Sequence, residues 1–114
     1  MASKPEFVAY VLDQLGGELN GVTCRKMFGE YGLHVYGRFF AVICDSTFFV
    51  KPTVAGEALL RARDEWLLAP PYDGAKDYFQ INNLEDAAFL SQLTEDTYYA
   101  LPEPKPKKRK TDAK

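Results

Sequence analysis

The fold of this chain is decided by one stretch, residues 22–51, which reads VTCRKMFGEYGLHVYGRFFAVICDSTFFVK. β-Branched and aromatic side chains dominate it, and short clusters of glycine, aspartate and serine interrupt them, which is typical of strands joined by tight turns. We expect four strands, at residues 22–28, 33–36, 39–44 and 47–51. Because residues 39–44 are apolar without interruption, both faces of that strand should be covered. The stretch therefore predicts an antiparallel meander.

The turns of this meander are predicted from its glycines and polar residues. The first turn is expected at residues 29–32. The second is a two-residue loop of Gly37 and Arg38, where the leading glycine suits a type II′ turn. The third lies at residues 45–46. Pro52 should end the last strand, because proline cannot donate a hydrogen bond to a β-ladder.

Three helices and one more strand are expected outside the meander. Ser3 should cap an N-terminal helix through an S-x-x-E capping box, and the helix should end at residues 16–17. Thr53 should cap a second helix, residues 78–81 should form a fifth strand, and Asn83 should cap a third helix. The order α-β-β-β-β-α-β-α predicts an α+β two-layer sandwich, in which helices pack on one face of an antiparallel sheet of about five strands.

The charge of the chain is divided unequally between a globule and a tail. Residues 103–114, EPKPKKRKTDAK, contain six basic and two acidic residues and only one apolar residue, an alanine. Such a segment cannot offset the entropy cost of ordering, so we expect one folded domain at residues 1–102 and a solvated tail at residues 103–114. Since the whole chain has a net charge of −2, the domain itself is acidic.

The basic residues of the tail are candidates for weak, non-specific contact with nucleic acid, since they are dense enough to meet phosphates. A nuclear-import signal and a plain solvated terminus are the alternatives. The candidate contact residues are Lys105, Lys107, Lys108, Arg109 and Lys110.

The sequence gives no sign of a membrane span, a secretion signal or an enzyme. No apolar run approaches the roughly 20 residues of a membrane helix, and the N-terminus lacks a hydrophobic signal core. A cytoplasmic protein with reduced cysteines is expected. Cys24, Cys44 and the single histidine, His34, have no third or fourth metal ligand at a usable spacing. We therefore expect packed thiols, a solvent-facing histidine, and no catalytic residue, metal or cofactor.

The opening of the meander resembles a known family. Residues 22–33, VTCRKMFGEYGL, are similar to the V-T-S-R-K-M-F-G-G-Y-G-L-like stretch of the TfoX/Sxy N-terminal domain family. The likeness continues through residues 37–41 and 48–51 and covers residues 4–101. Cys24 stands where the family usually has a serine, and the family's regulators carry a further C-terminal helical domain.

The resemblance implies a two-layer α/β fold and a link to regulation of natural competence, together with the cyclic-AMP receptor protein at promoters. A partner such as a transcription factor or an RNA polymerase assembly is therefore expected. A small ligand-binding or enzymatic domain and a plain homodimeric interaction domain are the alternatives.

A contact surface for that partner is expected from basic and aromatic residues. Adjacent strand residues point to opposite faces, so one of Arg25 and Lys26 should be exposed, although both could simply balance the acidic domain. Most tyrosines should belong to the core and its rim, and residues 66–78 are the segment most suited to an interface. The candidate contacts are Arg25, Lys26, Tyr31, Arg38 and Trp66.

Overall fold

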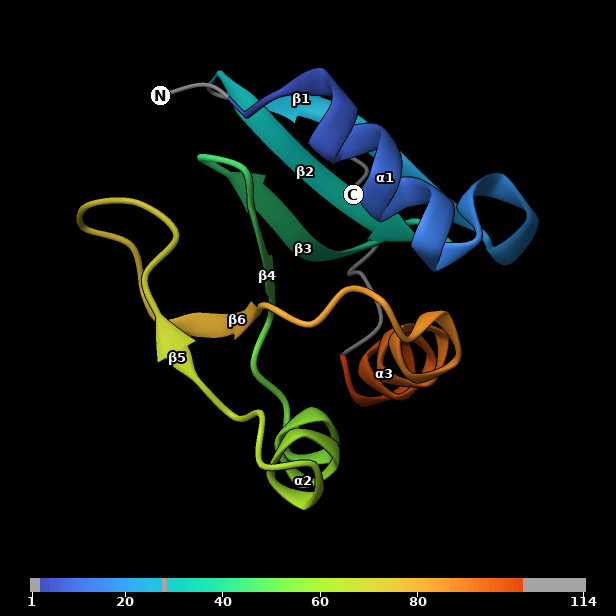
Figure 1. Cartoon of the computed structure of the whole chain (residues 1–114), viewed down its shortest axis with the longest axis vertical. Helices are drawn as coiled ribbons and strands as arrows, with labels where there is room; N and C mark the ends of the chain where they lie inside the picture. Colours follow the sequence, from blue (N-terminus) through green and yellow to red (C-terminus); the bar gives the residue numbers. More distant parts are fainter. Residues whose placement is uncertain (1–2, 28, 102–114) are drawn as a thin grey trace, which may run out of the picture.

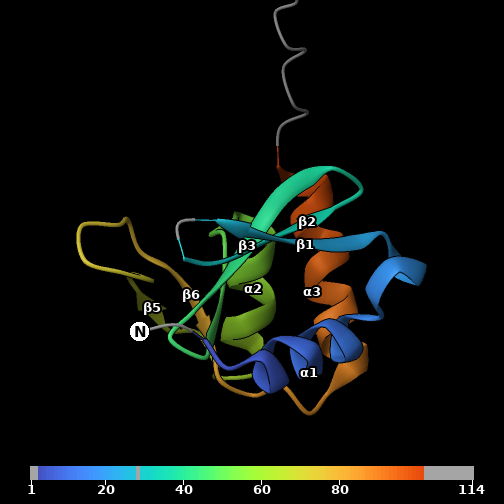
Figure 2. The same cartoon turned by 90° about the horizontal axis from the view of Figure 1, so that it is seen from above.

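The computed structural model describes residues 3–27 and 29–101 and confirms the α+β class. Six antiparallel strands form one sheet in the order β1-β2-β3-β4-β6-β5, and the helices pack on one of its faces (Figures 1 and 2). The helices are α1 Pro5–Leu15, η1 Gly17–Asn20, α2 Val54–Ala62 and α3 Ala87–Ala100. The strands are β1 Val22–Met27, β2 Glu30–Val35, β3 Arg38–Cys44, β4 Thr47–Val50, β5 Leu68–Ala69 and β6 Tyr78–Ile81.

The four-strand meander is confirmed, but its first two turns were predicted wrongly. Residues 30–32 belong to β2, where Gly32 pairs with Arg25. The second loop consists of Tyr36 and Gly37, with φ values of 48° and 84°, and positive φ at both positions is the pattern of a type I′ turn. Arg38 is already the first residue of β3 and pairs with Val35. The third turn lies at residues 45–46, as predicted.

Two of the predicted helix caps are also wrong. The Ser3 hydroxyl donates to Oε1 of Glu30 at 2.7 Å, so the capping residue of α1 is Lys4, which makes no side-chain cap. Helix α3 is capped by Asp86, whose carboxylate accepts from the backbone N–H of Phe89 at 3.1 Å, three residues after the predicted cap Asn83. Thr53 caps α2 as predicted.

The two faces of the sheet have separate cores. We name the helix-covered face the inner face and the opposite face the outer face. The inner face holds a cluster of seventeen buried hydrophobic residues from the sheet and the three α-helices. The outer face holds a small cluster of Val42, Cys44 and Phe49. Residues on both faces of β3 are therefore buried, as its apolar sequence predicted.

A β-bulge in β3 adjusts the distribution of residues between these faces. Leu33 pairs with Ala41 while His34 pairs with Phe39, so Phe40 is the extra residue on β3. Such a bulge changes which side successive residues face. As a result Phe40 and Ala41 both belong to the inner core, whereas Phe39 packs against the outer cluster.

Strand β5 was not predicted, because two residues are too few to show an alternating pattern. It pairs with β6 at the edge of the sheet. The connection between them, residues 70–77, is the yellow loop that extends away from α2 and α3 in Figure 1. This loop contributes one wall of the hollow described next.

Candidate functional site

A large open groove lies on the outer face, between β3 and the loop 70–77. We name it the outer groove. It has a volume of about 1250 Å³. Its floor is formed by the sheet residues Met27, Phe39, Val42, Cys44 and Tyr78, its wall by Pro71, Tyr72 and Ala75, and its charged rim by Glu30, Asp45, Asp73 and Lys76.

The floor of the outer groove follows from the local sequence. A Cβ atom on Gly32 would collide with Sδ of Met27 and lie 3.1 Å from the ring of Phe39. Glycine at this position therefore leaves room for these two large side chains on either side of β2. The result is a continuous apolar strip that crosses three neighbouring strands.

The wall of the outer groove is aromatic and accessible. Tyr72 is 63% exposed, while Pro71 beneath it is buried. Tyr78 is half-buried, and burial together with the nearby Tyr72 and Cys44 raises the pKa of its hydroxyl. The phenol of Tyr78 is therefore neutral near pH 7 and can donate or accept hydrogen bonds.

The thiol at the floor of the groove is not activated. Burial raises the pKa of Cys44, and the carboxylates of Glu30 and Asp45 raise it further. Cys24 packs on the inner face, where burial also raises its pKa. Because the two residues belong to clusters on opposite faces of the sheet, they do not pair, and both are free thiols, as expected. A thiol that stays protonated is a poor nucleophile.

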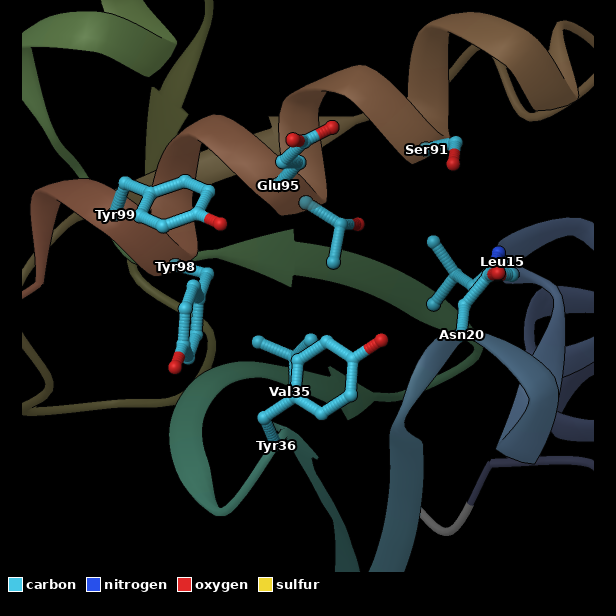
Figure 3. Close-up of a pocket in the computed structure, with 9 residues that line it drawn as sticks. Leu15, Asn20, Val35, Tyr36, Ser91, Glu95, Tyr98 and Tyr99 are labelled. Atoms are coloured by element: carbon cyan, nitrogen blue, oxygen red, sulfur yellow. The ribbon is translucent and has the colours of Figure 1, made fainter.

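A second hollow, the tyrosine pocket, lies between α3, the turn after β2 and the end of α1 (Figure 3). Its volume is about 270 Å³. Tyr98 lies edge-on to both Tyr36 and Tyr99, with ring centroids 5.6 Å and 5.0 Å away. Tyr36 and Tyr99 are largely exposed, which differs from the expected core position of most tyrosines.

Arg38 has a structural role beside the tyrosine pocket. Its Nη1 donates to the carbonyl oxygens of Tyr98 at 2.7 Å and Leu101 at 3.2 Å. Its guanidinium also lies 4.1 Å from the centroid of the Tyr98 ring. A cation that binds the last carbonyls of a helix stabilises the negative end of its dipole. Arg38 therefore ties the end of α3 to the β2–β3 hairpin.

The five predicted contact residues do not form one surface. Arg25 lies on the outer side of β1, and Lys26 and Tyr31 face each other on the inner side, with Nζ 5.8 Å from the ring centroid. Trp66 stacks with Arg61, whose Cζ is 4.0 Å from the ring. Only Lys26 and Tyr31 are brought together. The tail residues Lys105, Lys107, Lys108, Arg109 and Lys110 lie outside the described residues.

The sequence did not predict the outer groove, but it indicated the two segments that form it, β3 and part of residues 66–78. The uninterrupted apolar run of β3 predicted that something covers its second face, and residues 66–78 were the segment favoured as an interface. What joins them is a tertiary contact across about thirty residues, which local patterns do not contain. Within residues 3–27 and 29–101 no group of three histidine, cysteine or acidic side chains could hold a metal ion.

The fold and the groove define a class: a small two-layer α+β domain with an open groove on the sheet face opposite its helices. Comparison with known families identifies it further. Residues 13–103 match the TfoX N-terminal domain, and the chain belongs to this family. The resemblance predicted from residues 22–33 is thereby confirmed.

A curated relative supports the assignment. The chain is 38% identical over 112 residues to a protein of Spirochaeta aurantia named "Uncharacterized 12.7 kDa protein in trpE 5'region", covering 97% of this chain and 94% of that protein.

Among the described residues no helix combines the length and the apolar character that a membrane span needs.

Proposed function

We propose that this TfoX N-terminal domain is a non-enzymatic binding module of transcription regulation, and that a segment of a partner protein docks in its outer groove. The observation that carries the proposal is the groove itself, an apolar strip beside an exposed tyrosine on a sheet face without helices. Its volume of about 1250 Å³ exceeds the range of about 300–1,000 Å³ typical of small-molecule sites. A peptide segment fits such a groove better than a metabolite does.

The composition of the groove suits a protein contact. Protein interfaces have an apolar centre, enriched in tyrosine and other aromatic residues, within a polar rim. Phe39, Tyr72 and Tyr78 supply the aromatic groups, and the rim holds three carboxylates and one lysine. A partner segment with an apolar anchor beside basic residues would complement both parts.

The class of partner is inferred from the family resemblance. The resemblance links TfoX regulators to promoters, so a transcription factor or the RNA polymerase assembly is the proposed partner, in the cytoplasm. The protonated thiols support a binding role over cysteine catalysis, since a raised pKa removes the nucleophilic thiolate.

The test is direct binding of purified bacterial RNA polymerase and of cyclic-AMP receptor protein to the immobilised full-length chain. Tyr72→Ala removes the exposed ring of the groove wall, and Tyr99→Ala removes a ring of comparable exposure from the tyrosine pocket. We expect Tyr72→Ala to weaken binding about tenfold or more, as loss of an interface hot spot does, and Tyr99→Ala to leave it unchanged. Equal losses in both variants, or no binding of either partner by the wild type, would contradict the proposal.

A further inference from the structure

Three side chains converge on the outer face at the edge of the sheet that β1 forms. His34 pairs with Thr23 of β1 and with Phe39 of β3, and its ring lies 5.4 Å from that of Phe39. Arg25 lies two residues from Thr23, so it projects from the same face of β1. Lys51 reaches the group from the end of β4, with Nζ 5.0 Å from the Phe39 ring centroid. We name Arg25, His34 and Lys51 the cationic cluster.

Within the described residues, the charged and polar side-chain groups of this cluster lack carboxylate or hydrogen-bond partners. Within residues 3–27 and 29–101, the side chains of Arg25 and Lys51 form no hydrogen bond or ion pair with a carboxylate. Nδ1 of His34 is buried and has no hydrogen-bond partner. Glu30 lies on the same strand as His34, but its carboxylate already accepts from Ser3 and from the backbone N–H of Asp45.

The electrostatics of the cluster are unusual for an acidic domain. Burial lowers the pKa of His34, and Arg25 and Lys51 lower it further by repulsion. These two are the charged groups that act on His34, one from β1 and one from the end of β4. Like charges brought together without a compensating carboxylate raise the energy of the folded state. A bound anion would remove this electrostatic cost.

We propose that Arg25, His34 and Lys51 form a site for the phosphate group of a ligand. Arginine binds phosphate through its planar fork of N–H donors, lysine acts as a point charge, and the imidazole donates one further hydrogen bond. The aromatic ring of Phe39 lies next to His34 and Lys51 and forms one side of the site. The site shares the Phe39 ring with the outer groove, but its ligand is a phosphate group and not a protein segment, so either proposal can fail without the other.

The chain provides its own probe, since His34 is its only histidine. In the full-length protein without an affinity tag, one imidazole signal is followed by proton NMR through a pH titration, with and without inorganic phosphate at constant ionic strength. A bound phosphate anion within contact distance should raise the pKa of His34 by about one unit, because it favours the charged imidazolium. Arg25→Gln and Lys51→Gln should each raise the starting pKa and abolish the response to phosphate.

Lys26→Gln is the matched control. It removes the same charge from the neighbouring residue, which lies on the other side of β1 and is exposed. This variant should retain the full response. An unchanged His34 signal up to about 10 mM phosphate, which corresponds to binding weaker than any useful affinity, would overturn the proposal. A response of Arg25→Gln equal to that of the wild type would also overturn it.

Two further ligands identify the source of the phosphate. A mononucleotide and a short single-stranded oligonucleotide are compared at equal phosphate concentration. A response to the oligonucleotide at tenfold lower concentration would assign the site to a nucleic-acid backbone, and equal responses would assign it to small phosphate esters. Basic residues elsewhere do not confuse the result, because the His34 signal reports only its own surroundings. If neither ligand shifts that signal, the site does not serve a phosphate ligand.

Discussion

The inner and outer faces of the sheet are made by alternate residues of the same strands, yet they are covered very differently. Among the described residues, seventeen buried hydrophobic residues form the inner core beneath the three α-helices, whereas the outer cluster contains three. The outer face is instead bordered by a loop and left hollow over about 1250 Å³. The inner face therefore supplies most of the stability, and the outer face has room for a partner. Four predictions sharpen this division.

The largest effect is expected from a pair of adjacent phenylalanines in β4. Phe48 is 1% exposed in the inner core, and Phe49 is 5% exposed in the outer one. Phe48→Ala should lower the free energy of unfolding by about 3–5 kcal/mol, because it leaves a closed cavity. Phe49→Ala should cost about 2 kcal/mol, since the space it leaves adjoins the open groove and water can enter.

Urea unfolding of the two variants measures this difference. Equal losses would show that the outer cluster contributes to the fold as much as the inner core does. The separation of a stability face from a binding face would then be wrong.

A smaller effect is expected at Glu30, on the rim of the outer groove. Its carboxylate accepts from the Ser3 hydroxyl and from the backbone N–H groups of Ser3 and Asp45. It thus joins the start of the chain to the β3–β4 turn. Glu30→Gln should cost about 1–2 kcal/mol, as the loss of charged hydrogen bonds does. Asp73→Asn, at an exposed carboxylate on the same rim, should cost less than about 0.5 kcal/mol.

The Glu30 effect should depend on pH. Burial alone would raise the pKa of this carboxyl, but the hydrogen bonds from Asp45 and Ser3 outweigh burial and lower it. A lowered folded-state pKa contributes stability above the unfolded-state value, and this stability is lost as pH falls through the folded-state pKa. The difference between wild type and Glu30→Gln should therefore be constant near neutral pH and shrink below about pH 4.3. A difference that grows on acidification would contradict the assigned hydrogen bonds.

An effect similar in size to that of Glu30→Gln is expected from the buried thiol, and a smaller one from the half-buried thiol. Cys44→Ser should cost about 1–2 kcal/mol, because Cys44 is 7% exposed and the new hydroxyl would be buried. Cys24→Ser should cost less, since Cys24 is only half-buried. Both thiols should react with iodoacetamide more slowly in the native protein than in urea, owing to their raised pKa values. Native alkylation of Cys44 as fast as that of a free thiol would argue for an activated cysteine.

The sequence predicted what depends on local patterns and missed what depends on distant partners. The meander was predicted because its alternation and turn residues are contiguous. Ser3 was wrongly predicted as a helix cap. The acceptor of its hydroxyl, Glu30, lies 27 residues away in the sequence, so no local pattern shows this contact. Asn83 and Asp86 can both cap a helix, and Asp86 has in addition a guanidinium partner, Arg63 at 3.2 Å.

Contacts between residues distant in the sequence also explain why the candidate sites differ from those predicted. Arg38 was predicted as a partner contact, and the structure shows that its guanidinium also binds a carbonyl near the end of α3, sixty residues away. The cationic cluster draws on three separate strands or strand ends, so no motif contains it. His34 was expected to face solvent, whereas its ring lies against Phe39 with one nitrogen buried. Pairing of strands in register, which follows from the fold alone, brings these residues together.

The central claim is that the outer face, bordered by the loop 70–77, receives the partner protein. The most direct measurement is amide hydrogen exchange of the full-length chain, alone and with saturating RNA polymerase or cyclic-AMP receptor protein. We expect the exposed loop 70–77 to exchange more slowly in the complex, while the end of α3 beside the tyrosine pocket exchanges as before. Slower exchange at the end of α3 with an unchanged loop would place the contact at the tyrosine pocket and contradict the claim.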